Sequence, residues 1–298
     1  MSAPLVAAAP ASPPPPARRP LSPVRRNLRA FLRHRGGVLG AALVLFFILV
    51  ALTADLVAPY DPLAQDLTRR LQPPSGEHWL GTDDFGRDVL SRVLHGSRVS
   101  LRLGIVAVLV ALVVGGTIGL LAGYYGGAFD LLGMRVMDLM LAFPSILLSI
   151  VVVAILGPSL TNAMIAVGVM AVPQYARIVR GSVLSVRGLE YVQASRALGA
   201  ADPRILARAI LPNVTGPIIV TASLGLATAI LDAAGLSFLG LGAQPPIPEW
   251  GSMLSQGREL VLVAPWVLTA PGVAVFLAVL GFNLVGDALR DLLDPRRS

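Results

Sequence analysis

Acidic and histidine side chains between residues 78 and 95 are the first groups in the sequence whose types could do chemistry. His78, Asp83, Asp84, Asp88 and His95 are residue types that bind metal ions. Neither histidine, however, has the short spacing to a second ligand that recognisable metal sites show. Residues from about 86 onward also fit an amphipathic helix, with acids before its start and arginines toward its end, as the helix dipole favours. We therefore expect an interfacial helix here and no metal site.

Side chains that the sequence lacks exclude whole reaction classes. All 24 basic residues are arginine, and the chain has no lysine and no cysteine. A nucleotide-binding P-loop or a Schiff-base nucleophile needs lysine, and a thiolate nucleophile, a disulfide or a cysteine-based zinc site needs cysteine. The histidines lie outside the apolar runs, which argues against an enzyme that works inside a membrane. We predict no catalytic residue and no cofactor on this chain, so any ATP must be bound by another chain.

A second group of informative residues lies between 190 and 212. Good helix formers fill 190–198, and Gly199 stands where a helix would end. The Asp202-Pro203 pair predicts an N-cap and the first turn of a second short helix, which Pro212 interrupts. Small side chains on this hairpin would let another backbone approach closely and suit docking to a partner; they are Ala194, Ala197, Ala200 and Ala201. From the pattern alone, a hairpin that only joins two neighbouring segments is the simpler interpretation.

Ionisable residues in apolar surroundings are functional candidates, because a charge inside a bilayer is costly. Asp55, Asp138 and Asp287 fall near the ends of apolar runs, where a solvated carboxylate is the simpler interpretation. Arg135 lies three residues before Asp138 and could pair with it. Asp232 differs because long uncharged stretches flank it. We expect it to face a pore or a partner subunit if its helix continues, and the outer interface if the helix stops. A proton relay is disfavoured, because no second titratable group is placed comparably.

The composition shows that these groups belong to a membrane protein. Of the 298 residues, 55% are hydrophobic and 14% charged, and the mean hydropathy is +0.73. A soluble domain usually carries about 25% charged residues. Uncharged runs long enough to cross a bilayer core of about 30 Å cover 36–54, 103–129, 139–176, 209–231 and 260–286. The third is too long for one crossing, and a Gly-Pro-Ser turn at 157–159 divides it.

The sequence therefore predicts an all-α integral membrane protein with six transmembrane helices. They are expected near 38–58, 103–123, 135–157, 161–178, 214–237 and 264–286. The expected regions begin with a proline- and arginine-rich disordered tail over 1–35, a first helix over 36–58 and an extracytoplasmic segment over 59–102. A core with the other five helices follows over 103–290, and a short tail over 291–298. Residues 180–212 form the long loop within the core.

Arginines predict the orientation of the helices. They crowd residues 18–35, ahead of the first apolar run, and no acid precedes Asp55. The positive-inside rule therefore places the N-terminus in the cytoplasm, and an even number of helices brings the C-terminus to the same side. The first apolar run is expected to remain as a signal-anchor helix. The net charge of +7 is then an orientation signal, and no nucleic-acid partner is expected.

The loop around residues 193–212 resembles the cytoplasmic motif of permease subunits in bacterial ABC importers. That motif runs Glu-Ala-Ala, three residues, Gly, nine residues and Ile-x-Leu-Pro, and Gly199 and Leu211-Pro212 keep its spacing here. The departures are Gln193 for Glu, Ser195 for the second Ala, and Ala209 for Ile. A salt bridge between the family's glutamate and the ATPase is thereby put in doubt, although glutamine can still hydrogen-bond.

A second resemblance covers about residues 30–296. The stretch LGTDDFGRD is similar to a signature of the dipeptide, oligopeptide, nickel and glutathione permease family, C-type subunit, and so are AFPSILL, ILDAAGLSFLGLGAQPPIPEWGSML and FNLVGDALRDLLDP. ILDAAGLSFLGLGAQPP and QASRALGA look closest to dipeptide permeases. The signature residues are Gly81, Thr82, Asp83, Asp84, Gly86, Arg87 and Asp88.

This resemblance implies a type I ABC importer permease fold in the bacterial cytoplasmic membrane. It implies a heterodimer with a homologous permease subunit, two ATP-binding subunits that hold ATP and Mg, and an extracytoplasmic solute-binding protein. The segments 59–102 and 241–262 would meet that protein or cover the outer mouth. The loop would couple to an ATPase through Glu190, Gln193, Ala194, Ser195, Arg196, Ala197, Gly199, Asp202, Leu211 and Pro212. Pore or subunit contacts are expected at Asp232, Pro144 and Asp138.

The implied function is import of dipeptides or short oligopeptides, with nickel, glutathione or another small solute as the alternative. A secondary transporter is disfavoured because it would more often show an inverted repeat with broken helices and charges at mid-membrane. Only Pro144 and Pro173 interrupt the apolar runs in that way.

Overall fold

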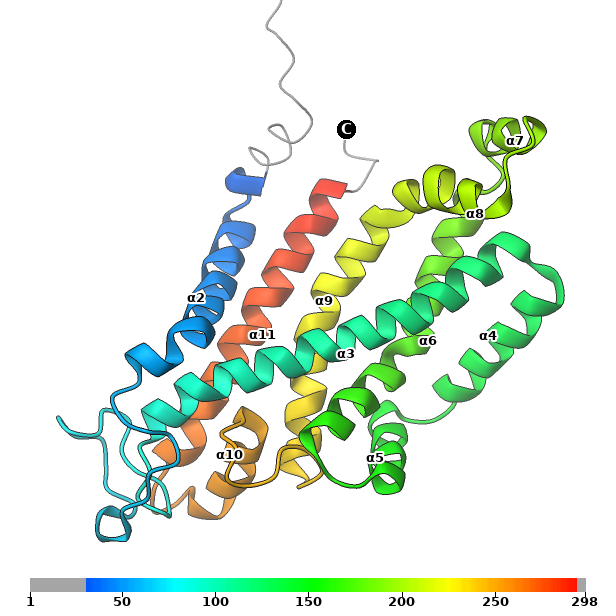
Figure 1. Cartoon of the computed structure of the whole chain (residues 1–298). Coiled ribbons are helices and arrows are strands. Elements are labelled where there is room, and N and C mark those ends of the chain that lie inside the picture. Colours follow the sequence, from blue (N-terminus) through cyan, green and yellow to red (C-terminus); the bar gives the residue numbers. More distant parts are fainter. Residues whose placement is uncertain (1–30, 294–298) are drawn as a thin grey trace, which may run out of the picture.

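The computed structural model describes residues 31–293, which form an all-helical bundle (Figure 1). Five helices are long and apolar enough to cross a membrane: α2 (Arg35–Val57), α3 (Val89–Tyr125), α6 (Leu160–Val186), α9 (Leu211–Phe238) and α11 (Trp266–Leu293). The pair α4 (Gly127–Leu141) and α5 (Ser145–Leu156) can supply a sixth crossing. The shorter elements are the 3-10 turns Leu67–Arg69 and Arg258–Leu260, α7 (Glu190–Ala197), α8 (Asp202–Ile205), the π-helical turn Leu206–Ile210 and α10 (Trp250–Gly257).

Helices α3 and α6 make the most extensive contact in the bundle. Gly115, Gly119 and Gly123 recur every fourth residue on the side of α3 that meets α6. A methyl group added at Gly119 would lie 3.0 Å from the carbonyl carbon of Ala176 and from the backbone nitrogen of Arg180. Small residues at such spacing let two helix backbones approach closely, which is how helices associate when lipid removes the hydrophobic driving force.

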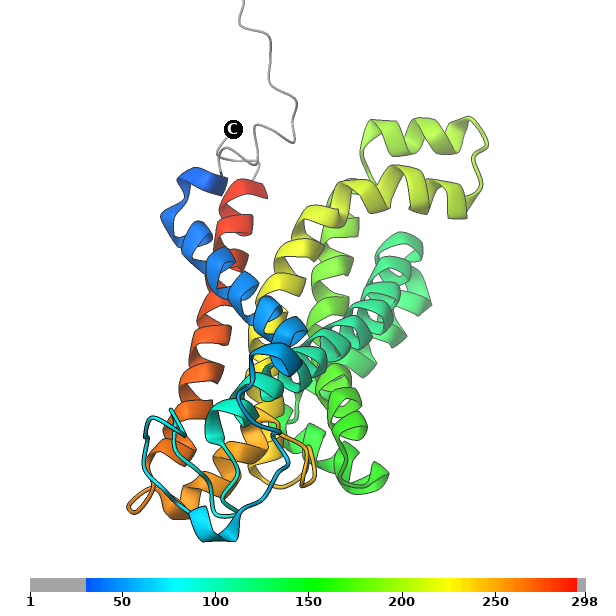
Figure 2. The same cartoon turned by 60° about the vertical axis from the view of Figure 1, so that its left-hand side comes forward.

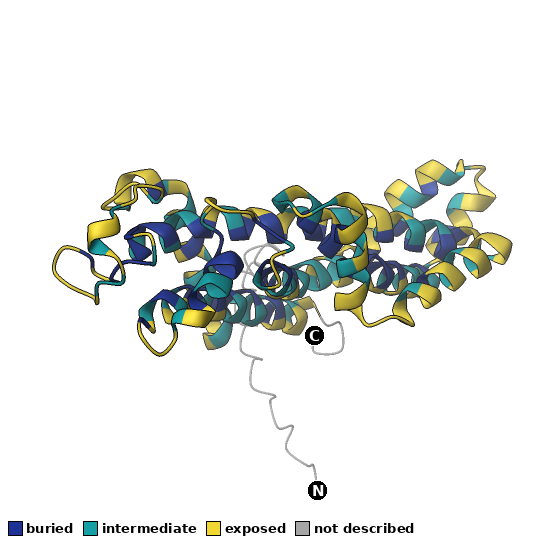
Figure 3. Cartoon of the chain, turned by 90° about the horizontal axis from the view of Figure 1, so that it is seen from below, coloured by how far each residue is buried: buried dark blue, intermediate teal, exposed yellow. Residues whose placement is uncertain are grey.

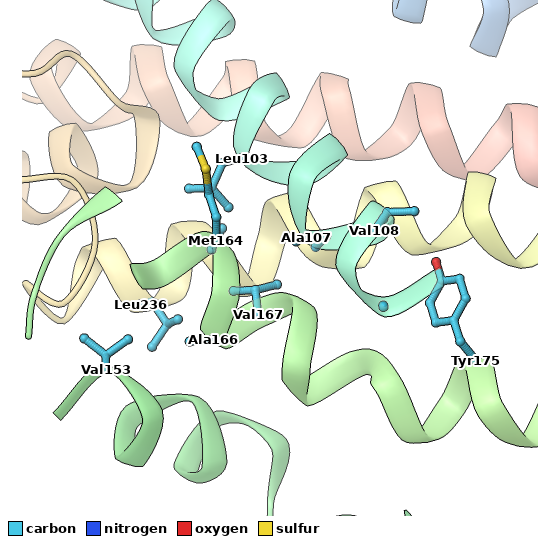
Figure 4. Packing of buried hydrophobic residues seen from close by; sticks show 12 residues of the cluster. Leu103, Ala107, Val108, Val153, Met164, Ala166, Val167, Tyr175 and Leu236 are labelled. Atoms are coloured by element: carbon cyan, nitrogen blue, oxygen red, sulfur yellow. The ribbon is translucent and has the colours of Figure 1, made fainter. Parts of the chain in front are cut away.

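The largest buried apolar cluster joins α3, α5, α6 and α9 (Figure 4). Its labelled members are Leu103, Ala107, Val108, Val153, Met164, Ala166, Val167, Tyr175 and Leu236. On the other side of the bundle, α2 packs on α11, and α11 packs on α9. Figures 1 and 2 show that α2 and α11 lie together at one side, with α4 and α5 at the opposite side. These contacts make the long helices one packed body.

Apolar side chains also cover much of the outside, and Figure 3 shows the buried residues gathered where the helices face one another. Leu52, Leu132 and Ile155 are 72%, 67% and 78% exposed, and each is on a different outer helix. A water-facing surface rarely carries so many exposed large apolar residues. The periphery therefore suits lipid or another apolar protein surface.

The expected single helix over 135–157 is wrong. The structure has two helices, α4 and α5, that meet at an angle of 95°. Pro144 stands between them, and proline removes a backbone donor and disfavours helical geometry in the residue before it. Pro144 thus breaks an apolar run that counting uncharged residues treats as continuous.

The second expected helix, over 103–123, is longer than predicted. An interfacial helix and a membrane span were expected as neighbours, whereas α3 runs unbroken through both. Asp88 caps it by accepting a hydrogen bond from the backbone nitrogen of Ser91. Arg92, Arg98 and Arg102 do not break the helix, because the first two have polar partners described below.

The remaining expected spans correspond to α2, α6, α9 and α11. Helix α6 continues to Val186 and α11 to Leu293, well past the predicted ends at 178 and 286. Most of the two expected tails lies outside the described residues.

Candidate functional site

Residues 190–210 form a hairpin that projects beyond the ends of α6 and α9 (Figure 2). It lies at the same end of the bundle as the start of α2 and the end of α11 (Figure 1). Gly199 has a φ of +78°, a conformation that only glycine adopts easily, and it turns the chain from α7 toward α8. The candidate docking element is therefore a defined helical hairpin rather than an irregular loop.

The outer surface of this hairpin is exposed. Its exposed candidates are Glu190, Gln193, Ala194, Arg196, Ala197 and Gly199, whereas Ser195 is half-buried and bonds back to the Tyr191 carbonyl. Leu198 is 88% exposed at the tip, the second most exposed large apolar side chain that the structure describes. The Gln193 side chain donates to the Gly188 carbonyl at 3.0 Å. The surface thus combines small residues with one protruding apolar side chain, which suits insertion into a groove.

Two predictions for the hairpin are wrong in detail. Asp202 does not cap α8: the N-cap is Ala201, with no side-chain hydrogen bond, and the Asp202 carboxylate is used elsewhere. Pro212 does not end the helix that begins at Asp202, because the chain stays helical to Phe238. A π-helical turn over Leu206–Ile210 precedes the proline. The wider spacing of its backbone hydrogen bonds accommodates the residue that lacks a backbone donor. Leu211 and Pro212 consequently lie at the base of α9, away from the tip.

The inner surface of the hairpin is fixed to the end of α3. The Tyr124 hydroxyl donates to an Asp202 carboxylate oxygen at 2.5 Å, and the Arg196 guanidinium lies 5.6 Å from the centre of the Tyr124 ring. Arg187 donates to the Gly123 carbonyl at 2.8 Å. Buried apolar residues of the hairpin and of α3, α6 and α9 complete the attachment: Tyr124, Val179, Val183, Val192, Ile205, Ile210 and Val214.

Tyr124 was missed at the sequence level. It stands at the end of an apolar run, where an aromatic side chain is unremarkable, and its carboxylate partner is 78 residues away. Nothing in the local spacing connects the two residues. The attachment appears only when α3 is seen to be long enough to reach the hairpin.

Residues 58–88 form a compact loop structure, here termed the cap, at the opposite end of the bundle (Figure 1). Asp83 accepts hydrogen bonds from the backbone nitrogens of Phe85 and Arg87, and from the Arg87 Nε atom at 2.7 Å. Arg92 Nε of α3 lies 3.5 Å from the same carboxylate. All three charged side chains are buried, so removing any one of them would leave an uncompensated buried charge.

The remaining signature residues also have structural partners. The Thr82 hydroxyl bonds to the Arg69 carbonyl and accepts from the Gln72 nitrogen. Gly81 and Gly86 both have a φ of +72°. Asp84 is half-buried, and burial together with the neighbouring Asp83 raises the pKa of its carboxyl group. The signature therefore specifies how the cap folds onto α3.

The histidine and acidic side chains near the cap do not gather into one cluster. Among the described residues, no group of three or more histidine, cysteine, aspartate or glutamate side chains could hold a metal ion. His78 Nδ1 lies 2.9 Å from Asp88, and His95 Nε2 lies 3.1 Å from Asp55. The two histidines thus have separate carboxylate partners.

Glu249 is a buried carboxylate that the sequence analysis missed. It caps α10 by accepting from the backbone nitrogens of Gly251 and Ser252, both at 2.8 Å, and Ser100 of α3 donates to it at 3.3 Å. Burial raises the pKa of this group. The residue joins α10 to α3, next to the fully buried Trp250.

The acids of the apolar regions have different environments. Asp138 pairs with Arg177 of α6 at 2.5 Å rather than with Arg135, and Asp55 pairs with His95 and Arg98. Asp287 is exposed.

Asp232 lies on α9, which continues past it to Phe238, and it lines a cavity of about 150 Å³ between α3, α6 and α9. It is half-buried, and among the described residues its carboxylate has no hydrogen-bonding or ionic partner.

The described structure is a helical bundle that can cross a membrane, with an exposed hairpin at one end. The family model described as binding-protein-dependent transport system inner membrane component matches residues 115–298. A second model, the N-terminal TM domain of oligopeptide transport permease C, matches residues 22–74. The chain belongs to this family of inner membrane permease components, and it is a multi-pass protein of the inner membrane.

Individual relatives are similar over nearly their whole length. A dipeptide transport system permease protein of Alkalihalophilus pseudofirmus is 49% identical over 294 residues, covering 98% of this chain and 97% of the relative. A glutathione transport system permease protein of Pectobacterium atrosepticum is 48% identical over 276 residues, covering 92% of each. A chain of the MetNI methionine ABC transporter in an inward-facing conformation has a TM-score of 0.56 at 21% identity, covering 67% of this chain and 96% of that chain. The last likeness shows the shared fold.

Proposed function

We propose that this permease moves dipeptides or short oligopeptides into the cell as part of an ABC importer. The observation that carries the substrate class is the 49% identity over nearly the full length to a dipeptide permease. A di/tripeptide permease of Pseudomonas aeruginosa is 45% identical over 281 residues. Glutathione is a second candidate, because a glutathione permease is 48% identical. It is itself a small peptide, so the same pathway would serve both.

The proposed assembly is a heterodimer with a homologous permease subunit, joined by two ATP-binding subunits and an extracytoplasmic solute-binding protein. ATP and Mg are held by the ATP-binding subunits. This division of labour fits a chain without lysine, which cannot build a P-loop of its own.

The proposed orientation places both termini and the hairpin in the cytoplasm and the cap outside. Arginines at the hairpin end of the described structure support it, because cytoplasmic flanks carry the excess of basic residues; they are Arg33, Arg35, Arg187, Arg196, Arg204, Arg208 and Arg290. The cap has three arginines too, but acidic side chains pair with two of them, Arg69 and Arg87.

The hairpin is the proposed coupling element. Ala194, Ala197 and Gly199 let the groove of an ATP-binding subunit approach, and Leu198 inserts into it. Closure of the ATP-binding subunits then moves the hairpin, which transmits the displacement to α3 through Tyr124 and to α9 through the continuous helical turn. The bundle rocks between inward-open and outward-open arrangements, and the cap receives the solute-binding protein.

Ala194→Glu and Gly199→Pro test this role. Each should abolish uptake of labelled dipeptide in a deletion strain and lower co-purification with the ATP-binding subunits, because a larger or misdirected surface no longer fits the groove. The amount of subunit in the membrane should stay unchanged, because Ala194 is exposed and because Gly199→Pro distorts only the turn of the exposed hairpin, where proline cannot adopt the φ of +78°. Ala128→Glu is the matched control, because Ala128 is an exposed alanine in the first turn of α4, outside the hairpin.

Normal uptake by the Ala194→Glu variant would contradict the coupling role. The same strain separates the substrate candidates when it is supplied in parallel with labelled dipeptide, longer peptide, glutathione and nickel. Uptake of nickel but of no peptide would overturn the proposed substrate class.

A further inference from the structure

The cavity beside Asp232 has walls from three helices. Ala107 and Val108 come from α3, and α6 contributes apolar residues together with Gln174 and Tyr175. Figure 4 shows Tyr175 on α6 with Val108 of α3 nearby. The third wall is the face of α9 that carries Thr221, Thr228 and Asp232, spaced by seven and four residues as one helix face requires. Polar groups thus line one side of an otherwise apolar chamber.

The hydroxyl groups of this chamber offer acceptors rather than donors. The Thr228 hydroxyl donates to the Gly225 carbonyl at 3.0 Å, and the Thr221 hydroxyl donates to the Pro217 carbonyl at 2.8 Å, both within α9. The Tyr175 hydroxyl donates to the Thr221 carbonyl at 3.3 Å. Each hydroxyl has therefore used its only hydrogen and can turn only lone pairs toward a ligand. A group that satisfies them must be a donor.

Asp232 adds a charge requirement to this pattern. Asp232 lies six residues before Phe238, where α9 ends near the cap, which is roughly 9 Å along the helix axis. An ionised side chain at such depth is costly unless an opposite charge pairs with it. The described residues supply none, whereas Asp55, Asp130 and Asp138 each have an arginine or histidine partner.

The size of the chamber limits what it can receive. At about 150 Å³ it is smaller than the roughly 300–1,000 Å³ of sites that enclose a whole ligand. It fits the end of a molecule whose remainder lies in a larger passage. Peptides that differ in every side chain still share one cationic terminus, the α-ammonium group, which carries three hydrogen-bond donors.

We propose that Asp232, with Thr228 and Tyr175, forms a subsite for the α-ammonium group of a peptide in transit. This inference rests on the proposed peptide substrate. The subsite offers a carboxylate and neutral acceptors to a terminus that every substrate has, so it stabilises passage without selecting side chains. Its contact with substrate is transient, and it acts on the rate of translocation rather than on affinity for the solute-binding protein.

Cysteine chemistry tests the charge requirement, because the chain has no cysteine of its own. In the reconstituted transporter, with its partner subunits and binding protein, Asp232→Cys should import a dipeptide roughly tenfold more slowly than the parent, as expected for a lost charged contact. Methanethiosulfonate ethylsulfonate then attaches a negative charge and should restore much of the rate. The trimethylammonium analogue attaches a positive charge of similar size and should not. Asp232→Glu should retain import.

Two controls isolate the effect of charge at position 232. The parent transporter treated with both reagents accounts for cysteines on partner chains. Ser223→Cys, on α9 but outside the cavity lining, should respond equally to both reagents. Equal responses at position 232 would overturn the subsite. So would loss of co-purification with the homologous subunit in Asp232→Asn, which would make Asp232 an assembly contact.

Import by the parent transporter separates failure of the subsite from failure of the substrate class. A parent transporter that imports no peptide refutes the proposed substrate class. A parent that imports peptide, beside an Asp232→Asn variant that imports it equally fast, refutes the subsite alone.

Discussion

Tyr124→Phe tests whether the attachment of the hairpin to α3 carries the coupling motion. The change removes a single oxygen atom, whose hydrogen bond to Asp202 measures 2.5 Å. The ring remains in its buried cluster, and the guanidinium of Arg196 keeps its position over it. The variant therefore weakens one contact and leaves the packing intact.

The expected magnitude follows from the environment of the bond. A hydrogen bond to a charged group contributes about 1.5–3 kcal/mol. Asp202 is half-buried, so water can partly replace the lost donor, and the lower value of about 1.5 kcal/mol applies. That free energy corresponds to about a tenfold change in an equilibrium constant. Peptide imported per ATP hydrolysed should fall by as much as about tenfold, while ATP hydrolysis itself continues.

The assay measures import and ATP hydrolysis in the same proteoliposomes. Tyr125→Phe is the matched control, because Tyr125 is 55% exposed and its hydroxyl has no hydrogen-bond partner among the described residues. Its ring packs against Tyr124 at a centroid distance of 5.0 Å. An unchanged ratio of import to hydrolysis in Tyr124→Phe, equal to that of the control, would refute the argument that this bond transmits motion.

Further predictions concern stability in the purified transporter, measured as thermal midpoints. Gly119→Ala should destabilise by about 1–3 kcal/mol because a methyl group meets the backbone of α6. A methyl group at Gly116 would meet only the Leu112 side chain, at an ordinary contact distance of 3.7 Å, so Gly116→Ala should cost nothing. Burial raises the pKa of the Glu249 carboxyl group in the folded protein above its ordinary 4.5. The free energy of unfolding should therefore fall as the pH rises from 4.5 through the folded-state pKa, because over this range the unfolded chain loses the proton more readily than the folded one. Glu249→Gln should remove this component of the pH dependence, and an identical pH profile would contradict it. Asp138→Asn should change stability by less than about 1 kcal/mol, because both partners of its ion pair are about half exposed; a larger loss would show that the pair is shielded by lipid or by another subunit.

The helical nature of the chain and the approximate membrane crossings could be predicted from the sequence, because both depend on local composition. Long uncharged runs became helices α2, α6, α9 and α11. A prediction from hydropathy is wrong where a single residue bends the chain without changing its hydropathy. Pro144 turns the chain by 95°, yet it contributes almost nothing to a count of apolar residues.

Site residues could be predicted where the motif itself is local. Gly199 was expected to end a helix, and its φ of +78° requires a glycine-like residue there. Partners separated by long stretches of chain could not be found this way. Glu249 meets Ser100 across 149 positions, and Arg177 meets Asp138 across 39. Such pairs depend on which helices become neighbours, which no single segment of sequence encodes.

The length of α3 has a mechanical consequence for the whole molecule. Its 37 residues make a rod of about 55 Å, nearly twice the thickness of a bilayer core. One end is anchored in the cap through Asp88 and Arg92, and the other holds Tyr124 and the hairpin. A tilt of about 10° around the middle would displace the two ends by roughly 5 Å in opposite directions. A rigid α3 would therefore transmit a displacement of the hairpin at one end to the cap at the other end.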